Sequence, residues 1–221
     1  MFYWDSTKQN SGKIFRNAGG VMRGEAMTKV CALLKSQGID MGSMSALEFF
    51  AREGDWQTIA YAKEVSSLEA WEIEATFLPG LRKNLPGSII RIVDSFEYGT
   101  VTRDRFDFIV LDNPQGVFGP KASFCEHFEA LPIAIRLLQK RGFIVFNLNF
   151  APFDLNQQPE WARRREQFYG IDETESLSVT GFLLPHYKRF FESKDLKIVQ
   201  SFFQLRNDEY LAYAVFQLEK L

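Results

Sequence analysis

The fold is decided by residues 45–74, which read SALEFFAREGDWQTIAYAKEVSSLEAWEIE. Residues 46–50 predict a strand, 51–54 a turn that ends in glycine, and 68–72 a second strand. Between them, residues 55–65 have the spacing of a helix, with an aspartate at its N-cap. A strand, a helix and a second strand of this length form a parallel βαβ unit, whose turn lies at the carboxyl edge of the sheet. Open α/β sheets hold ligands such as nucleotides at that edge.

The turn after the first strand resembles the first motif of the class I S-adenosylmethionine-dependent methyltransferases. That motif runs acid-x-Gly-x-Gly-x-Gly, and the corresponding residues here are EFFAREG, 48–54. Glu48 and Gly54 match it, whereas Phe50 and Arg52 stand where the family has glycines that let the backbone approach a ligand closely. The resemblance implies that Glu48, Arg52 and Gly54 lie beside the amino-acid part of the cofactor, S-adenosylmethionine. Either Arg52 binds the cofactor carboxylate, or Phe50 and Arg52 fill the space and exclude the cofactor.

Two later positions extend the resemblance. Glu72 ends the second strand and matches the family acid that binds the ribose hydroxyls, with Glu74 as the competing candidate on the same side of the chain. A third buried strand is predicted over 88–94, and Asp94, followed by Ser95, matches a polar residue at the adenine amino group. The structural alternatives are a solvated strand end for Glu72 and a capping or turn role for Asp94.

A polar turn, Asp112 to Gly116, follows an apolar run at 106–111 that predicts a central strand. It resembles the Asp/Asn-Pro-Pro-aromatic motif of amino-group methyltransferases acting on nucleic-acid bases, with the last two positions replaced. Asn113 can orient an amine or a hydroxyl through its carbonyl oxygen, and Asp112 can accept a proton. An ordinary turn is the alternative.

The third catalytic candidate is His127, near the start of a helix predicted over 124–141. Its unperturbed pKa of about 6.5 suits a general base, although a surface or capping histidine is the commoner case. We expect Asp112, Asn113 and His127 to line the pocket of the methyl acceptor and not the core. Substitution of Asn113 or His127 should then leave the melting temperature nearly unchanged.

The remaining segments continue the alternation of strand and helix. Helices are predicted over 25–37, 77–85 and 177–193, and a fifth strand over 143–148. A polar insert at about 151–172, which contains Arg163-Arg164-Arg165, predicts a cap helix, and two runs at 197–205 and 210–218 predict a terminal hairpin. The fold class is therefore α/β, a Rossmann-like three-layer αβα arrangement of about seven mostly parallel strands with an antiparallel C-terminal β-hairpin.

Composition limits the other properties. The 221 residues are 46% hydrophobic and 24% charged, with a net charge of −2, so no global field attracts nucleic acid or an anionic membrane. Cys31 and Cys125 form no metal cluster or disulfide framework and are expected to be buried thiols. No apolar run approaches the roughly 18 residues that span a bilayer, and we expect a cytoplasmic protein.

Residues 25–221 are expected to form a single domain, preceded by an arm or lid at 1–24. The aromatic residues Phe2, Tyr3 and Trp4 need a surface, which is either the crevice or a second subunit of a homodimer.

These features predict methyl transfer from S-adenosylmethionine to an oxygen or nitrogen of a small molecule, such as a sugar or a natural-product intermediate, without a metal. In-line displacement chiefly needs positioning, with a base only where the acceptor must lose a proton. Two alternatives stay open. One is a nucleic-acid base methyltransferase, suggested by residues 112–114, and the other is a non-catalytic binding module that has kept the fold.

Overall fold

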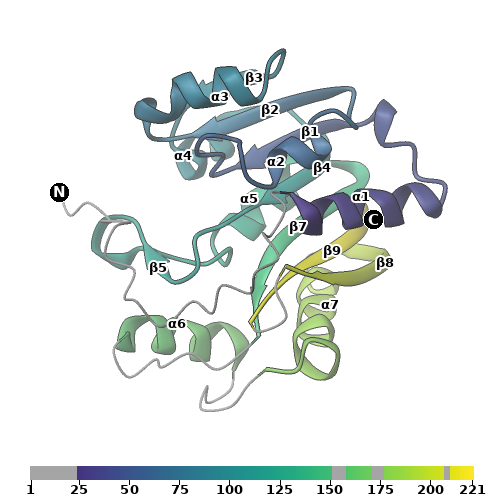
Figure 1. Ribbon diagram of the computed structural model, residues 1–221. Helices are drawn as coiled ribbons and strands as arrows, with labels where there is room; N and C mark the ends of the chain where they lie inside the picture. Colours follow the sequence, from purple (N-terminus) through teal and green to yellow (C-terminus); the bar gives the residue numbers. More distant parts are fainter. Residues whose placement is uncertain (1–23, 151–157, 171–176, 207–209) are drawn as a thin grey trace, which may run out of the picture.

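The computed structural model describes residues 24–150, 158–170, 177–206 and 210–221 (Figure 1). The predicted arm, except for its last residue, and part of the cap insert lie outside these ranges. Seven strands form one sheet in the order β3-β2-β1-β4-β7-β9-β8. The strands are β1 (Ser45–Phe49), β2 (Ser67–Glu72), β3 (Ile89–Ile92), β4 (Phe106–Leu111), β7 (Leu138–Asn149), β8 (Leu196–Leu205) and β9 (Leu211–Lys220).

The sheet has the predicted direction of its strands. β1 is parallel to β2 and β4, β2 to β3, and β4 to β7, whereas β9 runs antiparallel to both of its neighbours, β7 and β8. The seven-stranded, mostly parallel sheet with a C-terminal antiparallel hairpin is therefore confirmed. The strand order reverses between β1 and β4, so the crevice that open α/β sheets use for ligands lies at the carboxyl ends of these two strands.

Helices cover both faces of the sheet, which gives the predicted three layers (Figure 1). Helices α1 (Glu25–Ser36), α2 (Thr58–Tyr61) and α3 (Leu78–Asn84) pack on one face. The other face carries α4 (Ser95–Val101), α5 (Ala130–Leu137), α6 (Pro159–Tyr169) and α7 (Leu184–Glu192), which follows a π-helical turn, η6 (Val179–Leu183). The central strand β4 is apolar and largely buried, as expected of a parallel strand that is covered on both faces. Cys31 and Cys125 are buried free thiols, as predicted.

The helix predicted over 55–65 is wrong in extent, because only Thr58–Tyr61 is helical. Its N-cap is Gln57 and not Asp55. Gln57 points inward, where its side-chain oxygen accepts a hydrogen bond from the backbone N–H of Met27 at 3.3 Å. The crossover from β1 to β2 is thus built largely of turns held against α1.

The helix predicted over 124–141 is also wrong at both ends. Its first two residues instead form β6 (Phe124–Cys125), the second strand of a small antiparallel hairpin that begins with β5 (Val117–Phe118) and turns through the short helix η4 (Pro120–Ala122). Its last residues already belong to β7. The hairpin projects from the sheet between α4 and α6 (Figure 1). The physical reason is local, since Gly116 and Gly119 have φ of 124° and 77° and let the chain turn back on itself.

Candidate cofactor and acceptor site

The loop after β1 has the backbone of a glycine loop without its glycines. Phe50, Arg52 and Gly54, the three glycine positions of the family motif, have φ of 59°, 47° and 64°. Residues with a side chain rarely occupy this left-handed region, at a cost of about 1–2 kcal/mol each. The surrounding structure therefore holds the loop on this path despite its side chains.

Glu72 is one of the groups that hold the loop. Its Oε2 accepts a hydrogen bond from the backbone N–H of Arg52 at 2.6 Å, and its Oε1 accepts one from that of Glu74 at 2.9 Å. The carboxylate is 5% exposed and lies where β2 ends beside the loop. Since each carboxylate oxygen has a second lone pair, Glu72 can still accept from hydroxyl groups.

Gly54 is required by packing as well as by its backbone angle. A Cβ at this position would lie 2.6 Å from Leu85 Cδ1 and 3.3 Å from Leu81 Cδ2. The glycine thus allows the loop to rest directly on α3. In contrast, the side chain of Arg52 is exposed, and its guanidinium lies 5.6 Å from the ring centroid of Phe77, in the short helix η3 (Ala75–Phe77) that follows β2.

Glu48 lies beneath the loop in the interior of the protein. It is fully buried and accepts a hydrogen bond from Tyr61 Oη. Burial raises the pKa of Glu48 well above its usual range, and the nearby negative charge of Asp112 acts in the same direction. Glu48 is therefore part of the core below the loop, and its contact with the cofactor stays a prediction.

Asp94 caps α4, which was not predicted as a helix. Its Oδ1 accepts hydrogen bonds from the backbone N–H groups of Phe96 at 2.8 Å and Glu97 at 3.3 Å. Ser95 is the first residue of the helix and is 6% exposed. The capping alternative for Asp94 is thus correct, and its contact with adenine stays a prediction.

Four phenylalanine rings meet at the carboxyl edge above β1, β3 and β4. Phe96 and Phe124 stack in parallel with centroids 3.7 Å apart, and Phe118 lies 5.6 Å from Phe124 and 5.7 Å from Phe50. Phe50 is also 5.9 Å from Phe96. This phenylalanine cluster was not predicted, because its members come from the β1 loop, α4 and the β5–β6 hairpin, which are far apart in sequence.

The turn after β4, which was predicted to line the acceptor pocket, is part of a polar network. Asp112 Oδ1 accepts hydrogen bonds from Arg206 Nη1 at 2.5 Å and Asn147 Nδ2 at 2.8 Å. Asn113 is 2% exposed, and its Oδ1 accepts from the backbone N–H of Asn147 at 3.2 Å. The expectation that Asn113 lines an open pocket is therefore wrong. Asn147 and Arg206 were not predicted, although an asparagine inside the apolar β7 run is a signal that could have indicated the first.

His127 is enclosed in the core and does not lie at the crevice edge. It is fully buried, its Nε2 forms a hydrogen bond with Tyr187 Oη, and its ring lies 4.5 Å from that of Phe146. Burial lowers the pKa of His127 well below its usual range, and the charges of Arg165 and His186 act in the same direction. The prediction that His127 begins a helix is wrong, since α5 starts at Ala130.

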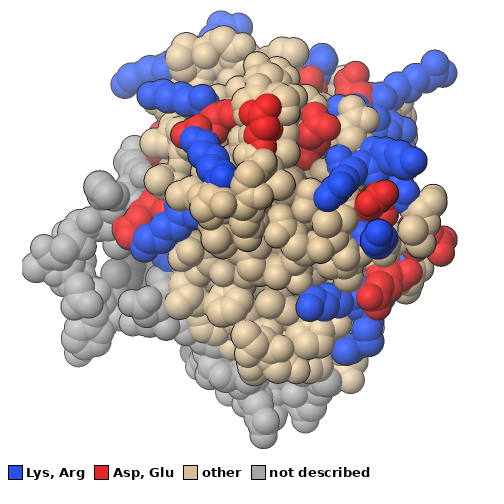
Figure 2. All heavy atoms as spheres, turned by 90° about the vertical axis from the view of Figure 1, so that its right-hand side faces the viewer, with Lys and Arg blue, Asp and Glu red and all other residues tan. Residues whose placement is uncertain are grey.

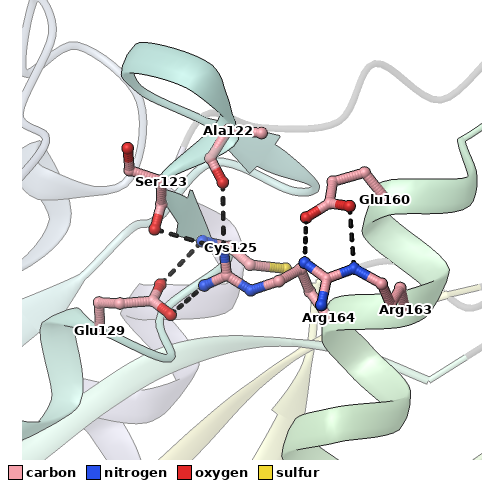
Figure 3. Close-up of polar contacts among 7 residues, drawn as sticks. All are labelled: Ala122, Ser123, Cys125, Glu129, Glu160, Arg163 and Arg164. Atoms are coloured by element: carbon pink, nitrogen blue, oxygen red, sulfur yellow. Dashed lines mark hydrogen bonds and ion pairs between the residues drawn. The ribbon is translucent and has the colours of Figure 1, made fainter.

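The three consecutive arginines of α6 point to three different partners. Arg165 is 2% exposed and pairs with the fully buried side chain of Glu126 at 2.6 Å. Arg164 pairs with Glu129 beside the hairpin, and Arg163 pairs with Glu160 of its own helix (Figure 3). The predicted cap helix is thus fastened to the β5–β6 hairpin and to the segment that follows it.

Other surface features are distinct from this edge. A shallow cavity of about 450 Å³ lies along α6, lined by Phe128, Glu129, Arg163, Arg164, Gln167 and Phe168. On the face shown in Figure 2, basic and acidic side chains are intermixed around a broad uncharged area. In the described ranges there is no helix long and apolar enough to cross a membrane, and no group of three or more acidic, cysteine or histidine side chains placed to hold a metal.

No known family model matches the sequence, and no curated protein is similar to it. Solved structures are similar in fold. Magnesium protoporphyrin IX methyltransferase from Synechocystis PCC 6803, with bound SAH, superposes with a TM-score of 0.54 at 10% identity over 90% of this chain and 84% of its own. N-methyltransferase NodS from Bradyrhizobium japonicum, also with S-adenosyl-L-homocysteine, gives 0.52 at 14% identity over 88% of both chains.

A third structure, YJHP from E. coli, gives a TM-score of 0.55 at 11% identity and covers 96% of this chain and 97% of its own. The strand order, the reversed last strand and these superpositions agree. The chain therefore has the Rossmann-like fold of the class I S-adenosylmethionine-dependent methyltransferases.

Proposed function

We propose that this protein binds S-adenosylmethionine at the carboxyl ends of β1 and β2 and transfers its methyl group to an oxygen or nitrogen of a small molecule. One observation carries the proposal. All three glycine positions of the β1 loop are left-handed, although two of them hold phenylalanine and arginine. A backbone conformation that costs free energy persists only where the surrounding structure holds it, and such positions cluster at active sites and ligand clamps.

The residues around this loop suit the parts of the cofactor. Glu72 has lone pairs left for the two ribose hydroxyls after binding the loop backbone. Gly54 keeps the loop close against α3 at the position proposed for the amino-acid part, and the exposed guanidinium of Arg52 is a planar, two-pronged donor for its carboxylate. At the end of β3, Asp94 and Ser95 are our candidates for the adenine contact.

The cofactor supplies an electrophilic methyl group on a sulfonium, so the chain mainly has to position the acceptor. Asp112 is the acceptor-side residue that we retain, because it is partly exposed and its carboxylate is oriented by Arg206 and Asn147. It can accept a proton from a hydroxyl or an amine. Asn113 and His127 support this region from within the core and touch no acceptor in this proposal.

A small acceptor is favoured over a nucleic-acid base by two observations. The sequence has a net charge of −2, which gives no general attraction to phosphates. The amide oxygen of Asn113, the central residue of the half-matched base-methyltransferase motif, is already bonded to the backbone of Asn147. A base entering this turn would have to displace that bond.

The second candidate is a non-catalytic module with the same fold. It is favoured by the phenylalanine cluster, whose four rings fill the carboxyl edge next to the loop. In this alternative the rings belong to the core and no cofactor enters.

Isothermal titration of the wild-type protein with S-adenosylmethionine and with S-adenosylhomocysteine separates the two candidates. The proposal expects saturable one-to-one binding of both compounds and an increase in melting temperature with each, since a ligand that binds the folded state stabilises it. Absence of heat and of thermal stabilisation at millimolar ligand would support the non-catalytic module.

A further inference from the structure

We propose that the β5–β6 hairpin is a shutter over the cofactor crevice, and that Arg164 is the catch that holds it closed. The inference rests on the proposed function, since it concerns how the proposed cofactor site opens. The hairpin makes ring contacts that the seven-stranded sheet does not need for its own packing. Two rings carried by the hairpin contact two rings at the carboxyl edge: Phe124 stacks on Phe96, and Phe118 meets Phe50 edge-on.

The position of these rings is what makes the hairpin a shutter. Phe50 belongs to the left-handed loop after β1, and Phe96 lies in the first turn of α4, two residues after Asp94. The hairpin follows β4, on the other side of the point where the strand order reverses. Its rings therefore bridge the two sides of the crevice. A planar adenine cannot stack on the face of Phe96 that Phe124 covers, because the two rings lie parallel with centroids 3.7 Å apart.

The backbone of the hairpin is strained in this closed position. Lys121 and Ala122 at its tip have φ of 52° and 56°, and Glu126 after it has φ of 48°. At Gly119, a Cβ would lie 2.5 Å from the ring of Phe124. Of the six non-glycine residues with positive φ in the described ranges, five lie in the β1 loop and this hairpin segment. Strain gathered in two facing segments is typical of elements with a second conformation.

One side chain from outside the hairpin holds its tip. Arg164 of α6 donates from Nη1 to the carbonyl oxygens of Ala122 at 3.0 Å and Ser123 at 3.3 Å, and from Nη2 to the carboxylate of Glu129 (Figure 3). Glu129 in turn accepts from the backbone N–H of Cys125, in β6, at 2.8 Å. Charge-assisted hydrogen bonds of this kind are about twice as strong as neutral ones. The guanidinium thus fixes both the tip and the second strand of the hairpin.

Arg164 lies on a helix that is anchored independently of the hairpin tip, and the neighbouring Arg163 provides a matched control. Arg165 anchors α6 through its buried ion pair with Glu126 and through a hydrogen bond from its Nη2 to the carbonyl oxygen of Asn149, at the end of β7, so α6 does not have to move when the tip is released. Arg163 has the same side chain one residue earlier. It pairs with Glu160 three residues before it on the same helix, and its side chain is 51% exposed. Arg163→Ala therefore removes an arginine from α6 without removing a hairpin contact (Figure 3).

The first experiment needs no cofactor. Hydrogen exchange of residues 117–126, followed by mass spectrometry, is compared in the wild type, Arg164→Ala and Arg163→Ala. We expect exchange about tenfold faster in Arg164→Ala, the effect of losing a charge-assisted hydrogen bond, and wild-type exchange in Arg163→Ala. Equal exchange in the two variants would overturn the catch.

The second experiment measures the association rate constant of S-adenosylhomocysteine by stopped-flow fluorescence. Arg164→Ala and Phe118→Ala, which removes one ring of the shutter, should both bind about tenfold faster than the wild type and Arg163→Ala. Faster hydrogen exchange in Arg164→Ala without faster association of S-adenosylhomocysteine would overturn the shutter but leave Arg164 as the catch. Binding to Arg164→Ala or Phe118→Ala but not to the wild type would support the shutter. Binding to none of the four proteins would overturn the proposed function and the shutter with it, and the exchange comparison would still decide the catch.

Discussion

The loop after β1 and the turn after β4 lie on neighbouring strands at the same edge of the sheet, and they differ in opposite ways from what their sequences predict. In the β1 loop, two side chains depart from the family motif, yet the backbone has the left-handed angles that glycines would give. In the β4 turn, Asp112 and Asn113 resemble a catalytic motif, yet both are engaged in an internal network with Asn147.

The difference shows that a loop can keep the backbone conformation of a motif although its residues differ from that motif. It also shows that a turn can keep the residues of a motif although their side chains are engaged elsewhere. A loop is defined by its φ and ψ angles, and here those angles are held by Glu72 and by the packing of Gly54 on α3. A polar side chain is defined by its partners, and the partners of Asp112 come from β7 and from the end of β8. Variants on the two sides test whether the β1 loop binds the cofactor and whether the β4 turn is structural.

The largest effect is expected on the β4 side. Arg206→Met leaves Asp112, whose side chain is 18% exposed, without its cationic partner. Breaking a largely buried ion pair from one side costs about 3 kcal/mol of folding free energy. Urea denaturation measures the loss, and the double variant Arg206→Met with Asp112→Asn should recover part of it because no unpaired charge remains. An unchanged midpoint in Arg206→Met would mean that this network is not structural.

The next effect concerns the β1 side. Glu72→Ala should weaken the binding of S-adenosylmethionine roughly tenfold to a hundredfold, because hydrogen bonds to a carboxylate are worth about 1.5–3 kcal/mol. Glu74→Ala is the matched control, two residues on and exposed. Calorimetric titration of the two variants gives the comparison. Equal affinities in two folded proteins would remove Glu72 from the site.

A smaller, pH-dependent effect tests whether His127 is structural. Because the folded protein holds the pKa of His127 below its unfolded value of 6.5, the unfolded state binds more protons as the pH falls below about 6.5. The contribution of His127 to stability is therefore complete above that pH and is lost below it, by up to about 1.4 kcal/mol per pH unit.

His127→Gln should show a flatter decline of stability between about pH 6.5 and pH 5 than the wild type, measured by urea denaturation at each pH. His186→Gln is the comparison, since the pKa of His186 is also lowered by burial but its ring is not enclosed. If His127→Gln keeps the wild-type pH dependence and melting temperature, His127 is accessible, as its sequence position first suggested.

The smallest effect is expected at Arg52. Arg52→Gly relieves a left-handed φ of 47° but makes the unfolded chain more flexible, so the two contributions nearly cancel and stability should change by less than about 1 kcal/mol. Affinity for S-adenosylhomocysteine should fall by less than about tenfold, the value of one exposed charged contact. A gain in affinity would indicate that the arginine side chain obstructs the crevice.

The sheet was predictable because buried parallel strands are continuous apolar runs, as in FDFIVL of β4, and because the terminal hairpin has two long runs around a polar turn. α4 was not predicted, although the sequence contains its signal, since Asp94 followed three residues later by Glu97 is a capping pattern. The position of Glu72 followed from its place at the end of the second strand.

The rest depends on contacts that no local pattern contains. The pairing of Asp112 with Arg206 exists because β9 and β8 follow β7 in the sheet. The stacking of Phe96 on Phe124 depends on a hairpin that replaces the first turns of an expected helix. Burial of His127 follows from Tyr187 of α7, a helix that comes much later in the chain.

The central claim is that the left-handed loop of the chain, with Phe50 and Arg52 in place of glycines, still holds S-adenosylmethionine. A crystal structure of the protein grown with saturating S-adenosylhomocysteine tests it most directly. We predict the ribose on Glu72, the amino-acid part over Gly54, and the rings of Phe118 and Phe124 displaced from Phe96. A crevice without ligand, with the four rings packed as they are here, would contradict the claim and assign the fold a non-catalytic role.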